Sequence, residues 1–137
     1  MIGPLRRWRE GRGRLPPEIR AELEAEGLEL LEERVPATVI YRGYEAYGQR
    51  PRSGTQSGLA AIALTGRRLV VRGTGGISLE IPRGAVVTRG DPDEVRLAYD
   101  AAAAYPTRSG EIELRLKTPR ADALHATLTE WMTRPSS

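Results

Sequence analysis

Hydrophobic and polar residues alternate with the two-residue period of β-strands along much of this chain, most clearly between residues 59 and 81. Leu59–Leu64 is apolar at successive positions, which is typical of a central strand, and Arg68–Val71 follows it closely. Ile77–Ile81 alternates strictly, as a half-buried strand does. The pattern predicts three antiparallel strands, joined by a tight hairpin turn at Thr65-Gly66 and a second turn at Gly73–Gly76.

Four further segments have strand character, which brings the predicted total to seven antiparallel strands. The first is rich in β-branched and aromatic residues, and Gly43 within it predicts a bulge. Pro82 ends the strand Ile77–Ile81, since proline cannot donate a hydrogen bond to a strand ladder. The four predicted strands are Ala37–Tyr47, Ala85–Arg89, Glu94–Asp100 and Glu111–Lys117.

The segments between these strands read as turns and loops. Gly48–Gly58 is polar and predicts a long loop that carries Arg50 and Arg52. Gly90–Asp93 has the composition of a turn, and Ala101–Gly110 predicts another loop.

Helical spacing appears at both ends of the predicted sheet. Pro16–Glu26 predicts a short helix that Gly27 can end in a left-handed cap. Leu28–Val35 fits either a further helical turn or a strand. A C-terminal amphipathic helix is predicted over residues 119–133, with Thr118 as its N-cap. Its apolar stripe consists of Ala121, Leu124, His125, Leu128, Trp131 and Met132.

The charge of the chain is concentrated in its first 14 residues. They hold five arginines and one glutamate, whereas the whole chain of 137 residues has a formal net charge of +3. We expect residues 1–14 to be a flexible arginine-rich arm and residues 15–137 to form a single domain. Twenty arginines to one lysine are typical of a GC-rich genome, so arginine content alone does not indicate nucleic-acid binding.

Cysteine is absent, which excludes disulfides and cysteine-ligated metals, and no apolar run approaches the roughly 18 residues that cross a bilayer. A cytoplasmic protein is therefore expected.

Residues with catalytic or metal-binding potential are few. His125 is the only histidine and lies on the apolar helix stripe, where a packing role is expected. Ser53, Ser57 and Ser109 have no neighbouring base in the sequence. Asp91, Asp93 and Glu94 fit a turn better than a weak cation site. We expect no enzyme activity, and no catalytic, cofactor or metal-binding residue.

Three segments resemble the pleckstrin-homology-like superfamily, in particular the bacterial PH-like and GRAM-type domains. They are ALTGRRLVV (63–71), SLEIPRGAV (78–86) and SGEIELRLKTPRADALHATL (109–128), and the likeness covers about residues 28–134. The resemblance implies a mainly β fold with helices (β+α). Its seven-stranded antiparallel bent sheet or barrel would span residues 37–118, capped by the C-terminal amphipathic helix and preceded by a short helix over residues 16–26.

The resemblance also implies a non-catalytic module that binds lipids, peptides or other proteins. Lipid-binding members hold phosphoinositides in a basic pocket near the first loop, where this chain has Arg50 and Arg52, joined by Arg67 and Arg72. The loop has no lysine and is interrupted by Pro51, so the phosphoinositide pattern is not met. Arg68 is expected to face inward and to form structural pairs.

Three functions follow as expectations. The first is an adaptor that binds an unknown protein partner at or near the inner face of the cytoplasmic membrane. The second is peripheral binding to anionic lipid through the first loop and the arm, with Arg6, Arg7, Trp8 and Arg9 as contacts. Two loop arginines would contribute about 2 kcal/mol, less than a millimolar affinity requires, so the arm should dominate. Weak nucleic-acid binding by the arm ranks last, and the oligomeric state is left open.

Overall fold

The computed structural model describes residues 13–45, 52–74, 77–105 and 107–134. Seven strands form one antiparallel sheet in the order β4-β3-β2-β1-β7-β6-β5, so β4 and β5 are its two edges. The strands are β1 (Leu28–Glu45), β2 (Arg52–Thr65), β3 (Leu69–Gly73), β4 (Ser78–Ile81), β5 (Val86–Arg89), β6 (Glu94–Asp100) and β7 (Ser109–Lys117).

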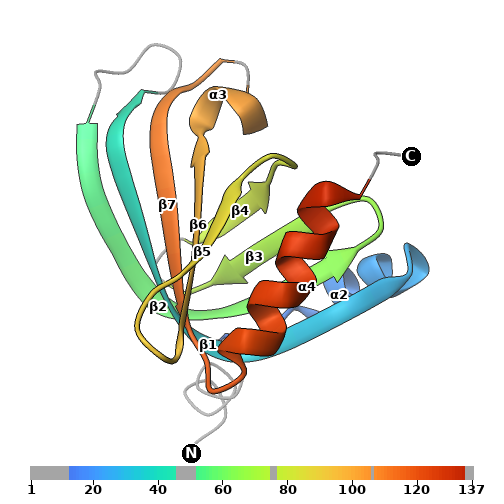
Figure 1. Ribbon diagram of the computed structural model, residues 1–137. Helices are drawn as coiled ribbons and strands as arrows, with labels where there is room; N and C mark the ends of the chain where they lie inside the picture. The colour runs from blue at the N-terminus through green and yellow to red at the C-terminus, as the bar shows by residue number, and fades with distance from the viewer. Residues whose placement is uncertain (1–12, 46–51, 75–76, 106, 135–137) are drawn as a thin grey trace, which may run out of the picture.

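The sheet curls into a half-barrel because β1 and β2 are long and strongly bent (Figure 1). Its inner face carries the alternating apolar residues of the strands, for example Ile112, Leu114 and Leu116 of β7, which are all buried. Ile77, Leu79 and Ile81 are buried and Ser78 and Glu80 exposed, so the predicted alternation of this strand is confirmed. The predicted β+α class and general PH-like shape are thus present.

Helix α4 (Ala121–Thr133) lies against the open side of the half-barrel and contacts β5 and β6 (Figure 1). Its residues Ala121, Leu124, Leu128 and Trp131 are buried in the main core, which confirms the predicted apolar stripe. Within the described residues, no helix has the length and apolar character needed to span a membrane.

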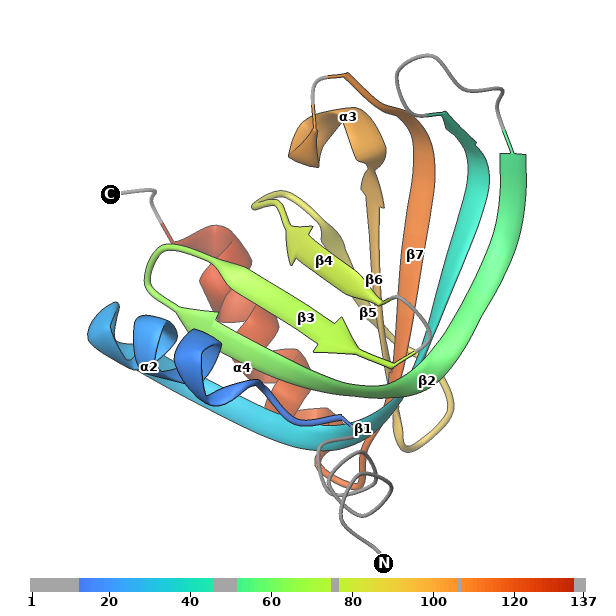
Figure 2. The ribbon, with the colours of Figure 1, turned by 180° about the vertical axis from the view of Figure 1, so that it is seen from behind.

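Helix α2 (Pro17–Ala25) packs on the opposite, outer face of the sheet (Figure 2). Leu15 and Leu23 form a second, smaller core there with Ala61, Ala63 and Val70. This explains why Leu59–Leu64 is apolar on both faces: β2 is covered by the main core on one side and by α2 on the other. Gly27 has φ +92°, as predicted for a left-handed cap.

Two segments predicted as irregular are regular. Arg52–Gly58 was predicted as a loop but is part of β2, because its backbone pairs with residues 37–44 of β1 although its own composition is polar. Ala101–Ala104, also predicted as loop, forms the short helix α3, which Asp100 caps by accepting a hydrogen bond from the backbone N–H of Ala102.

The bounds of the sheet and of the last helix also differ from prediction. Leu28–Val35, which the sequence left open, is strand, so the sheet begins at Leu28 and not at residue 37. The prediction of Thr118 as N-cap is wrong: α4 begins at Ala121 with Arg120 at the N-cap. The Thr118 hydroxyl instead accepts the backbone N–H of Arg120 and donates to Glu32, which ends β7 in a local turn. The bulge predicted at Gly43 is confirmed by φ +61° and a register shift between Tyr41 and Tyr44.

Candidate functional site

A second bulge interrupts β1 near its bend. The register with β2 shifts between Glu32 and Val35, and Arg34 adopts φ +59°. Arg34 is the one non-glycine residue with positive φ in the described part of the chain. A left-handed conformation costs an L-residue with a Cβ roughly 1–2 kcal/mol, a cost that glycine would avoid.

The bulge is held by Gly13–Leu15, a segment that we call the strap. The backbone N–H of Arg34 donates to the carbonyl of Gly13 (2.7 Å), and the N–H of Leu15 donates to the Glu33 carboxylate (3.0 Å). Leu15 is itself buried in the second core. The strap therefore joins residues 1–12 to the fold at the bulge.

Three arginines surround this junction: Arg14, Arg34 and Arg72, which we call the arginine cluster. Arg14 and Arg72 line a hollow of about 180 Å³ with Gly13, Pro16, Gly73, Thr74 and Ile77, and no acidic residue is among these lining residues. Arg34 lies directly beside Gly13 through the backbone hydrogen bond. In the described part of the chain, none of the three guanidinium groups is seen in an ion pair with a carboxylate. The Glu33 carboxylate bound to the strap offsets part of this charge, and the three arginines leave a local excess of positive charge.

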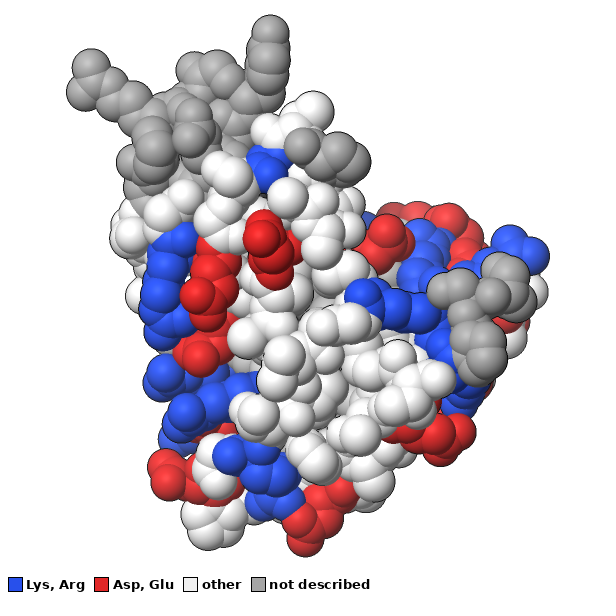
Figure 3. All heavy atoms as spheres, turned by 45° about the horizontal axis from the view of Figure 1, so that its top comes forward, with Lys and Arg blue, Asp and Glu red and all other residues white. Residues whose placement is uncertain are grey.

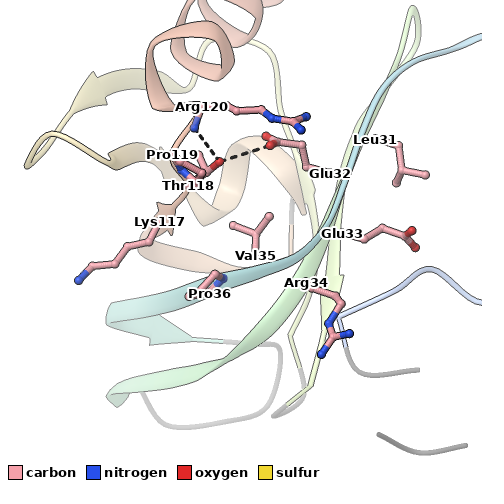
Figure 4. Close-up of a pocket in the computed structure, with 10 residues that line it drawn as sticks. All are labelled: Leu31, Glu32, Glu33, Arg34, Val35, Pro36, Lys117, Thr118, Pro119 and Arg120. Carbon is pink, nitrogen blue, oxygen red and sulfur yellow. Dashed lines mark hydrogen bonds between the residues drawn. The ribbon is translucent and has the colours of Figure 1, made fainter. Parts of the chain in front are cut away.

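A larger hollow of about 340 Å³ lies on the other side of the bulge, between β1 and the turn from β7 to α4 (Figure 4). Arg34, Lys117 and Arg120 line it, but so do Glu32 and Glu33. Figure 4 shows Arg34 extending away from Lys117 and Arg120. Since this hollow has mixed charge, the side of Arg14 and Arg72 is the one that would attract an anion.

Most other described arginines are neutralised within the fold. On the outer face of the sheet, Arg42 and Arg115 pair with Glu113, and Arg96 pairs with Glu94. Arg68 pairs with Glu22 (2.9 Å) and Glu26 (2.6 Å), which confirms its predicted structural pairing, although it faces α2 on the outer side of the sheet and not inward. Hydrogen bonds from Arg68 lower the pKa of Glu26, although burial of the carboxylate opposes this shift.

Of the basic residues predicted to contribute to one site, Arg67 and Arg72 are described with their side chains, and these two lie apart. Arg67 is exposed in the β2–β3 turn, whereas Arg72 lies at the far end of β3 beside the strap. Arg52 begins β2 opposite Tyr44. Arg50 and the predicted contacts of the arm, Arg6, Arg7, Trp8 and Arg9, lie outside the described residues.

The end of the half-barrel where β1 and β2 connect is opposite to the end where the strap lies (Figures 1 and 2). The start of β2 at Arg52 and the strap therefore lie at different ends of the molecule. Sequence reasoning missed Arg34. The run of three charged residues, Glu32 to Arg34, breaks the strand alternation and was the available signal of a bulge.

The remaining predicted chemistry is placed as follows. His125 is partly buried on α4. Glu94 is buried and its carboxylate pairs with Arg96, while its N–H donates to the carbonyl of Asp91. Across the described ranges, no three acidic, histidine or cysteine side chains converge in a group that could hold a metal ion.

One face of the molecule has a broad central area without charged side chains (Figure 3). Val86 on edge strand β5 has 61% of its surface exposed, and it is the one large hydrophobic residue in the described part of the chain classed as exposed. An uncharged surface area and an exposed apolar residue on an edge strand are each typical of places where proteins meet.

Comparison with known proteins adds no family to this geometry: no protein-family model matches the chain, and no curated protein matches it.

Proposed function

We propose that the chain is a non-catalytic interaction module of the pleckstrin-homology-like class that attaches to the anionic inner face of the cytoplasmic membrane. The observation that carries this proposal is the position of the arginine cluster. Three guanidinium groups without a carboxylate partner in the described structure surround the residue at which the arginine-rich arm joins the fold. The arginine-rich arm is thus joined to the cluster along the sequence.

The charge of the arm and the cluster is sufficient for reversible binding. Each arginine near an anionic surface contributes about 1 kcal/mol. The five arginines of residues 1–14 with Arg34 and Arg72 make seven, which sums to about 7 kcal/mol and corresponds to a dissociation constant between 1 mM and 1 μM. Such binding is electrostatic, so salt should weaken it.

Flotation of the full chain with lipid vesicles tests this proposal. We expect the protein to float with vesicles of phosphatidylcholine and phosphatidylglycerol at low salt, and to be released at about 0.5 M salt, where the Debye length falls to a few ångströms. Vesicles of phosphatidylcholine alone are the control. Absence of flotation with anionic vesicles at low salt would overturn membrane attachment.

A second candidate function is the binding of a protein partner, which would make the module an adaptor. The exposed Val86 on an edge strand and the uncharged area of Figure 3 favour it. A photo-crosslinking amino acid at position 86, introduced into the chain in its own cells, should give a discrete crosslinked product. The same amino acid at Thr55, which is exposed on β2, should not give it.

A further inference from the structure

We infer that the arginine cluster itself docks on the bilayer, with Arg34 as its central contact, and thereby fixes the orientation of the half-barrel. The strap and bulge would face the lipid, and the end where β1 and β2 connect would face away from it. This inference rests on the proposed membrane attachment and names the contact surface on the folded domain. An arm that acted only as a tether would leave the domain without a preferred orientation.

The conformation of Arg34 is the first argument. At φ +59° the position would favour glycine, and arginine there costs roughly 1–2 kcal/mol. The side chain is exposed, and within the described residues its guanidinium is seen in no hydrogen bond or ion pair. The fold therefore gains nothing visible from the guanidinium to offset this cost. A role outside the fold accounts for a charged side chain at a strained position.

The rigidity of the junction is the second argument. The strap is held by two hydrogen bonds and by the burial of Leu15. A Cβ atom on Gly13 would lie 2.8 Å from the Cα of Arg34, so the two backbones are in direct contact. The backbone that carries Arg14 and Arg34 is thus fixed, so binding has to order only their side chains.

The distribution of charge around the bulge is the third argument. Toward Lys117 and Arg120, Glu32 lines the hollow and offsets the positive charge, and Arg34 and Glu33 border the same hollow. Toward Arg14 and Arg72, no carboxylate lines the smaller hollow, and the Glu33 carboxylate bound to the strap offsets one of the three guanidinium charges. The strap side therefore keeps a net positive charge, which suits an anionic surface.

The decisive comparison is between two variants of the full chain that lose the same charge. Arg34→Gly removes the central contact and also relieves the left-handed conformation, so the fold should be as stable as the wild type or more stable. Arg67→Gly removes an exposed arginine in the β2–β3 turn that is seen in no ion pair in the described structure. We expect Arg34→Gly to reduce partition into phosphatidylcholine–phosphatidylglycerol vesicles about fivefold, the factor for one arginine at the surface. Arg67→Gly should leave partition unchanged, and Arg34→Lys should retain it.

Orientation can be read directly because the chain has no cysteine. A fluorophore on a cysteine at Pro36, which is exposed beside the bulge, should be quenched by lipids with nitroxide headgroups. The same fluorophore at Thr107, exposed near α3 at the opposite end, should not be quenched.

The outcomes separate this inference from the proposed function. If the wild type does not float at all, membrane attachment fails and the orientation with it. If the wild type floats, but vesicle binding falls equally in both glycine variants or in neither, membrane attachment stands and the proposed docking surface is wrong. Quenching that is equal at both positions would also overturn the orientation. An effect of Arg34→Gly on duplex DNA binding alone, with vesicle binding unchanged, would assign the cluster to nucleic acid and reject a lipid contact.

Discussion

Gly13 and Arg34 show how one residue's backbone can decide where another residue's charge is placed. Gly13 has φ +71° and contacts the backbone of Arg34, and its carbonyl accepts the hydrogen bond that holds the bulge. A glycine is required at position 13 for both reasons, the positive φ and the lack of space for a Cβ. Arg34 has the same left-handed conformation, but it carries the Cβ that makes this conformation costly.

The change Gly13→Ala should destabilise the protein by about 1–3 kcal/mol, because a positive φ and a backbone clash each carry a cost of that order. A Cβ at this position would lie 2.8 Å from the Arg34 Cα and 2.9 Å from the Leu59 Cβ. Urea unfolding followed by circular dichroism measures the loss. Gly54→Ala is the matched control, since a Cβ added to Gly54 in β2 would meet no atom within 4 Å and the strand should tolerate it. Equal stability of both variants would show that the strap is not packed against the bulge.

At the scale of the elements, the sequence was most informative where one face of a strand or helix is buried and the other is not. Strands β4, β6 and β7 and the stripe of α4 were predicted because their apolar residues recur with a fixed period. The β2 segment Arg52–Gly58 was not predicted as strand, because its pairing with β1 is a tertiary interaction that its polar residues do not encode. The arginine cluster could not be predicted for a similar reason: positions 14, 34 and 72 meet only through the strap, the bulge and the end of β3.

Helix α2 is attached to the sheet by the second core and by a paired charge whose effect depends on pH. Arg68 donates from Nε to Glu26 Oε1 (3.1 Å) and from Nη2 to Glu26 Oε2 (2.6 Å), and the Glu26 side chain is only 19% exposed. These hydrogen bonds lower the pKa of Glu26 below its ordinary value of 4.5. The carboxylate therefore contributes stability above pH 4.5, and this contribution is lost as pH falls through the folded-state pKa.

We expect Glu26→Gln to lower the free energy of unfolding at pH 7 by about 1 kcal/mol, as for a bidentate pair near the surface. The difference from the wild type should shrink as the pH falls from about 5 to about 3, since the wild-type carboxylate then becomes protonated. Urea titrations at several pH values measure both quantities. Glu24→Gln is the control, because Glu24 and Arg20 form a pair whose side chains are about half exposed (54% and 49%). If the difference in unfolding free energy between Glu26→Gln and the wild type did not change with pH, the Glu26–Arg68 ion pair would not be what attaches α2 to the sheet.

At the scale of the whole molecule, the half-barrel must join elements that the sheet's hydrogen bonds leave separate. The two edges, β4 and β5, are connected in sequence by residues 82–85, and α4 lies against this open side. Arg83 in the connection links three parts of the fold. Its guanidinium donates to the carbonyls of Trp131 and Arg134 at the end of α4 and to that of Gly66 (2.6 Å) in the β2–β3 turn.

The same guanidinium lies 4.0 Å from the centre of the Trp131 ring, whose Nε1 donates to the carbonyl of Thr65 (2.9 Å). Arg83 and Trp131 thus close the β2–β3 turn, the β4–β5 connection and the end of α4 into one unit. This arrangement requires a planar group with several donors that can also stack on a ring, and a lysine ammonium lacks that geometry.

Arg83→Lys should consequently destabilise the protein by about 2 kcal/mol although it preserves the charge, because carbonyls that now accept from a charged donor lose it. The measurement is urea unfolding followed by circular dichroism and by Trp131 emission, in a background with Trp8→Phe that leaves one tryptophan. Arg42→Lys is the control. Arg42 lies 3.5 Å from Glu111 and 3.6 Å from Glu113, and its side chain is 47% exposed. A lysine ammonium at this position should pair with the two carboxylates almost as well as the guanidinium does. If Arg83→Lys unfolded like the wild type, the open side of the half-barrel would be held by the apolar contacts of α4 alone.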